Sequence, residues 1–267
     1  MAPPIRIEHD PANGVCELVL DRPEHGNAID LELADALVRA ATRTQHDDVH
    51  VVLLRADGRN FCVGGDIRTF DVTDPQATIR PLANRLHKAI QLLVDTPVPV
   101  VAAVQGWATG AGLSLALAAD ILILAEDARC KAAYGSLGLT PDGGLTWSLP
   151  RRLPRAIVAD LLLSDRVLSA PEALDRGLAS RVHPSVDLDT EARAYAQALA
   201  GRSRTAAVRI KALLQAADGA DLSTQLDHES DNIAAAAAEP DGREGVTAFL
   251  EGRTPNFRAA QFPTDPS

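Results

Sequence analysis

The first part of the chain changes from alternating hydrophobic residues to hydrophobic residues at helical spacing. Residues 5–8 and 15–20 alternate on either side of a turn rich in Pro, Asn and Gly, which predicts a β-hairpin. Asp30 is the predicted N-cap of a helix over residues 31–45, and the continuous apolar run 50–55 predicts a buried strand. The chain therefore opens with a hairpin and a strand–helix–strand unit.

Strands and helices continue to alternate until about residue 145, after which helices dominate. The pattern predicts strands at 98–104 and 121–124 and helices at 74–95 and 110–119. Repeated crossovers of this kind are typical of a largely parallel, buried sheet. Alanine-rich stretches predict later helices at 191–200, 205–217, 223–238 and 242–251. We expect an α/β core over residues 1–200 and a C-terminal helical lobe over residues 201–267.

Bulk composition limits the classes of function. The 267 residues, 46% hydrophobic and 23% charged, suit one large globular domain or a domain with a smaller lobe. A net charge of -10 disfavours the basic surface that nucleic acids require, so we expect no nucleic-acid partner. Three cysteines without CxxC spacing suit a reducing compartment, and no apolar run approaches the ~20 residues of a membrane span. We expect a cytoplasmic protein with no membrane partner.

Two glycine-containing loops follow predicted strands and are candidates for ligand contact. Gly64 and Gly65 lie in the sequence Asn-Phe-Cys-Val-Gly-Gly-Asp. Paired glycines let a ligand approach the main chain closely, although an ordinary turn is the alternative. The second loop, residues 105–112, precedes a short predicted helix whose first backbone N–H groups favour developing negative charge.

The second glycine loop also has a nucleotide-binding interpretation. Gly110 and Gly112 fit a loose GxGxxxA pattern, and Glu126 ends the next predicted strand as a ribose-binding acid would. However, five residues separate Val104 from Gly110, whereas a dinucleotide-binding loop turns sharply away from its strand. We therefore disfavour nucleotide binding.

Two sets of ionisable residues invite chemical interpretations. Asp142 lies in the sequence Leu-Gly-Leu-Thr-Pro-Asp-Gly-Gly just before a predicted helix. Its carboxylate either caps that helix or acts in catalysis, and the pattern leaves both open. His46 and His50 stand four apart across a predicted helix end, so solvated surface is a better interpretation than a shared metal. We expect no metal site.

Taken in order, these segments resemble the crotonase (enoyl-CoA hydratase/isomerase) superfamily from Ile5 to Phe257. The resembling motifs are LDRPEHGNA at 20–28, FCVGGD at 61–66, VPVVAAVQGWATGAG at 98–112, Ala119-Asp120, GLTPDGG at 138–144, SAPEALDRGL at 169–178 and EGVTAFLEGRTPNF at 244–257. The similarity covers nearly the whole chain, and so many motifs at consistent spacing do not agree by accident.

The resemblance implies a fold, an assembly and a ligand. It implies a spiral core of repeated ββα units, a helical lobe for trimerisation and pocket cover, and a homotrimer or dimer of trimers. It also implies an acyl-CoA substrate, with no cofactor beyond the coenzyme A of that thioester. In such enzymes two backbone N–H groups hold the thioester oxygen, and the matching residues here are Val63 and Ala111. Such donors stabilise an enolate as its charge develops.

The resemblance also bears on the reaction. Enoyl-CoA hydratases carry two glutamates that position water, and the matching positions hold Ser114 and Tyr134, which weakens the hydratase interpretation. Asp142 matches the aspartate of certain family isomerases, and the chain most resembles members of the 1,2-epoxyphenylacetyl-CoA isomerase type, which serve phenylacetate degradation. The favoured expectation is an enoyl-CoA isomerase with Asp142 as proton shuttle. Hydration, thioester hydrolysis or dehalogenation with Asp142 as nucleophile, and non-catalytic acyl-CoA binding stay open.

The residues that the resemblance assigns to substrate binding lie mostly in the two glycine loops. They are Arg22, His25, Gly64, Gly65, Asp66, Ile67, Arg68, Gly110, Ser114 and Tyr134. The loop around Arg22 and His25 matches family contacts to the nucleotide and pantetheine of CoA, although Glu24 stands where some relatives have lysine. Ser114 and Tyr134 are expected to shape the acyl pocket.

Overall fold

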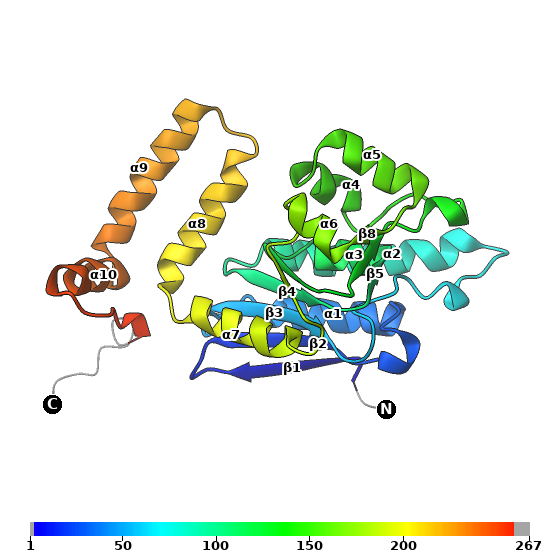
Figure 1. Ribbon diagram of the computed structural model, residues 1–267, viewed down its shortest axis with the longest axis horizontal. Coiled ribbons are helices and arrows are strands. Elements are labelled where there is room, and N and C mark those ends of the chain that lie inside the picture. The colour runs from blue at the N-terminus through cyan, green and yellow to red at the C-terminus, as the bar shows by residue number, and fades with distance from the viewer. Residues whose placement is uncertain (1–2, 259–267) are drawn as a thin grey trace.

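The computed structural model describes residues 3–258 (Figure 1). It contains a six-stranded sheet, a three-stranded sheet and helices packed around them. Within the described residues, no helix is long and apolar enough to cross a membrane. The α/β class predicted from the sequence is confirmed.

The six-stranded sheet has the order β1-β2-β3-β4-β6-β9. Its strands are β1 (Ile5–Asp10), β2 (Val15–Leu20), β3 (Val51–Ala56), β4 (Val100–Val104), β6 (Ile121–Ala125) and β9 (Arg181–His183). β1 and β2 form the predicted antiparallel hairpin, and every other neighbouring pair in this sheet runs parallel. β3 and β4 are buried at every position, as continuous apolar runs predict for strands covered on both faces.

The hydrophobic pattern does not predict the three-stranded sheet. Its strands, in order, are β5 (Trp107–Thr109), β7 (Arg129–Lys131) and β8 (Leu168–Ser169). Strands of two or three residues are too short to show a periodicity. β5 runs through the second glycine loop, and a bridge between Cys62 and Ala108 pairs it with the first. The two glycine loops therefore meet.

Seven α-helices belong to the described part of the core. They are α1 (Leu31–Arg43), α2 (Pro75–Val94), α3 (Ala111–Ala116), α4 (Leu145–Ser148), α5 (Arg155–Ser164), α6 (Ala170–Asp175) and α7 (Leu188–Ala200). The Asp30 side chain accepts a hydrogen bond from the Leu33 N–H at 2.9 Å, which confirms the predicted cap of α1. The helix predicted at 110–119 is shorter than expected, since α3 ends at Ala116 and a turn follows.

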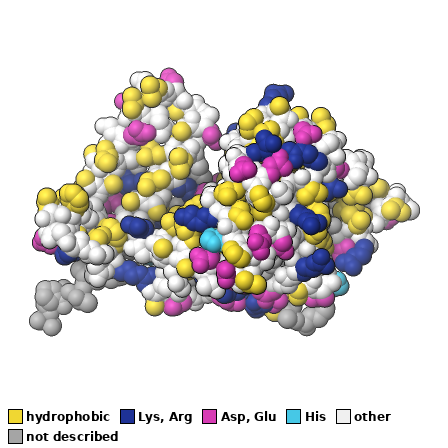
Figure 2. All heavy atoms as spheres, in the orientation of Figure 1, with side chains coloured by type: hydrophobic (Ala, Val, Ile, Leu, Met, Phe, Trp, Pro, Cys, Tyr) yellow, Lys and Arg dark blue, Asp and Glu magenta, His cyan; other side chains and the backbone are white. Residues whose placement is uncertain are grey.

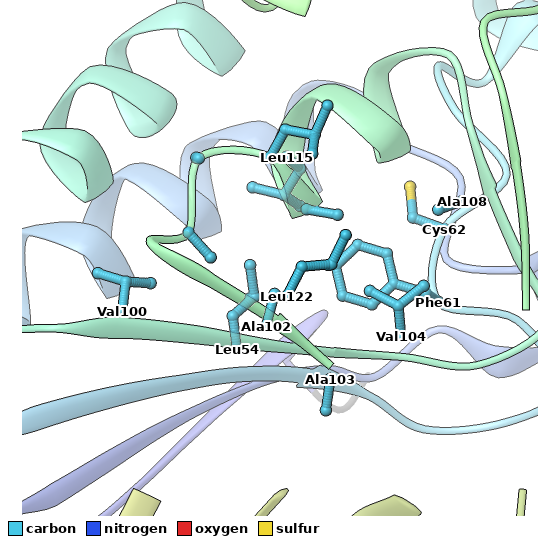
Figure 3. Close-up of a cluster of buried hydrophobic side chains, with 14 of the residues drawn as sticks. Leu54, Phe61, Cys62, Val100, Ala102, Ala103, Val104, Ala108, Leu115 and Leu122 are labelled. Atoms are coloured by element: carbon cyan, nitrogen blue, oxygen red, sulfur yellow. The ribbon is translucent and has the colours of Figure 1, made fainter. Parts of the chain in front are cut away.

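The first glycine loop is anchored in the hydrophobic core (Figure 3). Leu54 of β3, Leu122 of β6 and Leu115 of α3 belong to this cluster. Phe61 and Cys62 lie among them and are fully buried. Burial of a large apolar side chain such as Phe61 contributes roughly 1.5–3 kcal/mol. The loop that follows these two residues is consequently held against the sheet at its base.

The helical lobe lies to one side of the core (Figure 1). Its described helices are α8 (Arg204–Ala217), α9 (Leu222–Ala238) and α10 (Pro240–Glu251). α9 has no buried residue, and Lys211 is the one buried residue of α8. Figure 2 shows a hollow between this lobe and the core, with hydrophobic side chains on the lobe surface. The boundary at residue 200 stays a prediction, and residues 259–267 of the predicted lobe lie outside the described residues.

His50 corrects one expectation. It is 8% exposed, not solvated, and stands directly before β3. Its backbone N–H donates to the carbonyl oxygen of Gly14 at 2.8 Å, and its imidazole lies against Gly14 in the hairpin turn. Burial, and then nearby arginines, lower the pKa of His50. The parallel pairing of β2 with β3 decides this burial, and the local sequence pattern does not show it.

Candidate active site

A cavity of about 680 Å³ opens beside the two glycine loops. Its walls come from these loops, from α2 and from residues 133–142. Most of the lining side chains are apolar, and the charged residues that line it are Asp66, Arg68 and Asp142. The volume lies within the range of roughly 300–1,000 Å³ that is typical of small-molecule sites.

The two glycine loops pack so closely that glycine is required at two contact points. Gly64 has a φ of +101°, and a Cβ there would lie 2.9 Å from the carbonyl oxygen of Thr109. A Cβ on Gly112 would lie 2.3 Å from the carbonyl oxygen of Cys62. Neither approach leaves room for a side chain, so the glycines allow the two main chains to meet at the cavity.

The predicted oxyanion donors, Val63 and Ala111, both line the cavity. Ala111 is the first residue of α3, so its N–H has no partner within the helix. The N–H of Val63 donates to the carbonyl oxygen of Gly26 at 3.1 Å. This bond would have to lengthen for Val63 to hold a thioester oxygen. The two residues share one cavity, and their role as donors stays a prediction.

Asp142 lines the cavity with a side chain that is 31% exposed. Its Oδ1 accepts a hydrogen bond from the Tyr134 hydroxyl at 2.6 Å. The following helix, α4, has Gly144 at its N-cap and no side-chain capping bond. Helix capping by Asp142 is therefore wrong, and its carboxylate is directed to Tyr134 instead.

Ser114 and Tyr134 hold the Asp142 segment from two sides. Burial, and then the neighbouring Asp142 charge, raise the pKa of Tyr134, so its hydroxyl keeps its proton and stays a donor. Ser114 is buried, and its Oγ donates to the main-chain carbonyl oxygen of Asp142 at 2.9 Å. Tyr134 therefore positions the carboxylate, whereas Ser114, which does not line the cavity, holds the main chain of the same residue. Neither residue supplies a carboxylate.

His87 on α2 is a site residue that sequence reasoning missed. Its Nε2 lies 3.5 Å from Oδ2 of Asp142 and accepts a hydrogen bond from the Gly143 N–H at 3.1 Å. Because Nε2 accepts this bond, the ring carries its proton on Nδ1. The one sequence signal for His87 is its position directly after Leu86, which lines the cavity. This signal is weak, since the contact between His87 and Asp142 joins segments that are far apart in the sequence.

The structure brings most of the predicted substrate-binding residues together. Those that line the cavity are Gly64, Gly65, Asp66, Ile67, Arg68, Gly110 and Tyr134. Arg68 donates two hydrogen bonds of 2.8 Å to Asp66, and these hold the pKa of Asp66 below its usual value. Arg22 pairs with Asp30, and exposed His25 lies near Glu24, so neither lines the cavity. Contact of Arg22 and His25 with CoA stays a prediction.

Comparison with known proteins gives consistent matches along the chain. The family model for enoyl-CoA hydratase/isomerase matches residues 10–260. The 1,2-epoxyphenylacetyl-CoA isomerase of Escherichia coli K12 is 38% identical over 248 residues, which cover 91% of this chain and 95% of that protein. The 2,3-dehydroadipyl-CoA hydratase of the same organism is 32% identical over 246 residues, which cover 90% and 94%. These relatives carry both isomerase and hydratase names.

Comparison with solved structures gives matches of the same family. The crystal structure of an enoyl-CoA hydratase from Polaromonas sp. JS666 matches with a TM-score of 0.87 and 35% sequence identity. The match covers 95% of this chain and 99% of that one.

Proposed function

Because this chain belongs to the enoyl-CoA hydratase/isomerase family, whose members act on acyl-CoA thioesters, we propose that it is an enoyl-CoA isomerase with Asp142 as its proton carrier. The proposed substrate is a 3-enoyl-CoA or a related thioester, and the product is its 2-enoyl isomer. The proposed reaction uses no cofactor other than the coenzyme A of the substrate. Family membership alone also fits hydration, so the choice rests on the residues around Asp142.

The surroundings of the Asp142 carboxylate are the observation that carries this proposal. Of the two carboxylates that line the described cavity, Asp66 is paired with Arg68, whereas Asp142 has no arginine or lysine partner. The positions that match the hydratase glutamates, Ser114 and Tyr134, direct their hydroxyls at Asp142. One carboxylate suffices to carry a proton between two carbons, whereas the hydratases use two to position water.

The proposed reaction consists of two proton transfers. The Asp142 carboxylate removes a proton from C2 of the 3-enoyl-CoA, and the electrons of that C–H bond enter a dienolate with its charge on the thioester oxygen. The protonated carboxyl group then returns the proton at C4, and the double bond forms between C2 and C3. One proton leaves and one returns, so substrate and product are isomers.

The other site groups support these transfers. In the proposal the N–H groups of Val63 and Ala111 stabilise the oxygen where charge develops, which makes backbone geometry more important than side-chain identity at these positions. The Tyr134 hydroxyl fixes Oδ1 of Asp142, which leaves Oδ2 to move the proton. Ser114 holds the main chain of the same residue.

The test is to incubate the purified protein with hex-3-enoyl-CoA in deuterated buffer and to follow products by mass spectrometry. We expect the 2-enoyl isomer, with deuterium at C4 in the fraction of turnovers in which the protonated Asp142 exchanges with the buffer before it returns its proton, and at least a ~1,000-fold loss of conversion in Asp142→Asn. Asp95→Asn, an exposed aspartate after α2, is the matched control and is expected to keep its activity. Undiminished isomerisation by Asp142→Asn would contradict the proton-carrier role, and a hydrated main product would replace isomerase by hydratase.

A second candidate function follows from the contact between His87 and Asp142. In this alternative the Asp142 carboxylate attacks the thioester carbonyl and the CoA thiolate leaves. His87 then releases the Gly143 N–H from Nε2 and draws a proton from the water that cleaves the acyl-aspartyl intermediate. The 3.5 Å separation of Nε2 from Oδ2 suits a base next to a nucleophile. The shuttle mechanism gives His87 no role as a base.

Intact-protein mass spectrometry separates the two candidates. Hydrolysis predicts that His87→Gln accumulates a covalent acyl adduct on Asp142 when it is mixed with an acyl-CoA. The isomerase predicts no adduct and a fall in kcat of less than about 10-fold, since His87 then acts only through the Gly143 contact. An unmodified mass in both wild type and His87→Gln, with free CoA not released, would eliminate the second candidate.

The proposed assembly is a homotrimer or a dimer of trimers, formed through the helical lobe. Its helices expose several large apolar side chains: Ile210, Leu214, Leu222, Leu226, Ile233, Val246, Phe249 and Leu250. Monomeric proteins rarely expose many such residues together. No described lobe residue lines the cavity of its own chain, so a cover would come from a neighbouring copy. Sedimentation should give a trimeric mass that falls in a Phe249→Ser, Leu250→Ser variant, and a monomeric wild type would contradict the assembly.

A further inference from the structure

One wall of the cavity is apolar and comes mostly from a single face of α2. Ile79, Leu82, Ala83 and Leu86 line it at the i, i+3, i+4, i+7 spacing of one helical face. Phe70 lines the cavity from the segment that precedes this helix. A ligand that passes Asp142 toward α2 therefore meets hydrocarbon.

Two leucines from another segment extend the apolar surface. Leu137 and Leu139 line the cavity and are 54% and 41% exposed. Large apolar side chains with this exposure lose contact with water when a ligand covers them, which favours an apolar ligand. The hydrophobic lining is thus continuous across segments that are far apart in the sequence.

Among the described residues that line the cavity, none offers a free cation to an anion. Arg68 lines the cavity but is held by two hydrogen bonds to Asp66. Arg85, on α2, pairs with Asp35 at 3.3 Å and does not line the cavity. The remaining charged residue of the described lining is Asp142, which is itself acidic. A carboxylate placed here would lose its water, gain no cation and face a like charge.

We infer that the site accepts acyl groups that are uncharged and apolar along their whole length, and rejects CoA thioesters that end in a carboxylate. This inference rests on the proposed function, because it takes the thioester to lie at the glycine loops and the acyl group to extend past Asp142. Selection then comes from the face of α2 and from the Asp142 charge. The residue that moves the proton also helps to exclude anionic acyl chains.

A matched pair of unreactive thioesters tests the inference on the wild-type protein. Hexanoyl-CoA and adipoyl-CoA have six acyl carbons each and differ in a terminal methyl or carboxylate. Isothermal titration calorimetry should show adipoyl-CoA binding about 100-fold more weakly or worse, since its carboxylate stays unpaired. Equal affinities would overturn the inference while leaving the proposed function intact. Binding of neither thioester would overturn the proposed function, and the inference with it.

A designed cation provides the second test. Ala83 is half-buried and lines the cavity, whereas Ala77 is exposed on the same helix and does not. Ala83→Arg should reduce the preference for hex-3-enoyl-CoA over hex-3-enedioyl-CoA at least about 10-fold in kcat/KM, because the guanidinium pairs with the carboxylate. Ala77→Arg should keep the wild-type preference. A folded Ala83→Arg protein with an unchanged preference would show that the acyl group does not reach α2.

Discussion

The core and the helical lobe of this protein differ in how completely their side chains are buried within the chain. In the core, the site loops are packed so tightly that Gly112 leaves no room for a Cβ, and Phe61 beneath them is fully buried. In the lobe, α9 has no buried residue, and a Cβ on Gly219 would meet nothing within 4 Å. The core therefore positions its chemistry through its own packing. The lobe packs as tightly where α10 begins, since a Cβ on Gly242 would lie 2.1 Å from the Ala236 carbonyl oxygen, but α9 leaves its large apolar side chains exposed.

Two glycine substitutions test this contrast most strongly. Gly112→Ala should lower the free energy of unfolding by about 3 kcal/mol and kcat at least about 100-fold, because its Cβ collides with the Cys62 carbonyl and moves Ala111. Gly219→Ala, in the turn between α8 and α9, should change stability by less than about 0.5 kcal/mol. Urea denaturation and steady-state kinetics measure both. Similar losses in the two variants would remove the contrast.

The junction between the two regions is the next target. The buried Lys211 ammonium of α8 donates to Asp120 at 2.8 Å and to the carbonyl oxygen of Val98 at 3.2 Å. Loss of one partner of a buried pair costs roughly 3–5 kcal/mol, but the Asp120 side chain is 35% exposed, so we expect about 2 kcal/mol for Lys211→Met. Urea denaturation checks this value, with the exposed Lys88→Met as control. An unchanged midpoint would show that the lobe needs no such anchor.

Tyr134→Phe separates the chemistry of the core from its packing. The change removes the hydrogen bond to Asp142 and little volume, so kcat for hex-3-enoyl-CoA should fall about 10-fold while KM changes little. Tyr195→Phe, at the other tyrosine of the chain, is the control and should retain wild-type kinetics. A rise in KM with unchanged kcat would assign Tyr134 to substrate binding and not to the orientation of Asp142.

The smallest expected effects concern the pH dependence of stability at two glutamates, Glu17 in the core and Glu244 in the lobe. Burial raises the pKa of Glu17 in β2, but hydrogen bonds from Arg193 and Arg55 outweigh it, and the net pKa is lowered from 4.5. A carboxyl group with a lowered folded-state pKa stabilises the fold above about pH 4.5, and this contribution disappears as the pH falls through the folded-state value. The stability difference between wild type and Glu17→Gln should therefore shrink below pH 4.5.

Glu244 of α10 is the counterpart in the lobe. Arg253 and the Asn256 N–H lower the pKa of Glu244 to about 2. However, the Arg253 side chain is 42% exposed, whereas the Arg55 partner of Glu17 is 5% exposed, so water and salt screen the lobe pair more. Glu244→Gln should show no resolvable change in pH dependence at physiological salt, as measured by urea denaturation across pH 3–7. A larger effect at Glu244 than at Glu17 would reverse the expected order of the two regions.

Much of the fold was predictable because it depends on local patterns. The hairpin, the Asp30 cap and the buried strand β4 follow from alternation, capping and a continuous apolar run. β5, β7, β8 and β9 were not predicted, since two or three residues form a strand only through partners elsewhere in the chain. Burial of His50 was missed for the same reason, because the hairpin turn above it comes from a distant segment.

The candidate site divides in the same way. Asp142 and the glycine loops were identifiable from their motifs, and the glycines are needed because main chains meet there. Two features of the site depend on the packing of α2 against the segment before α4. Asp142 does not cap α4, and His87 lies beside Asp142.

The sequence by itself determined several of the longer helices and strands of this protein, its family and the residues suited to an acyl-CoA site, because propensity, capping and motif spacing act over short stretches. Only the tertiary structure decided which side chains meet, how Tyr134 and Ser114 hold Asp142, and that α2 closes the cavity with hydrocarbon. These contacts join segments far apart along the chain, and their geometry depends on the packing of every element between them.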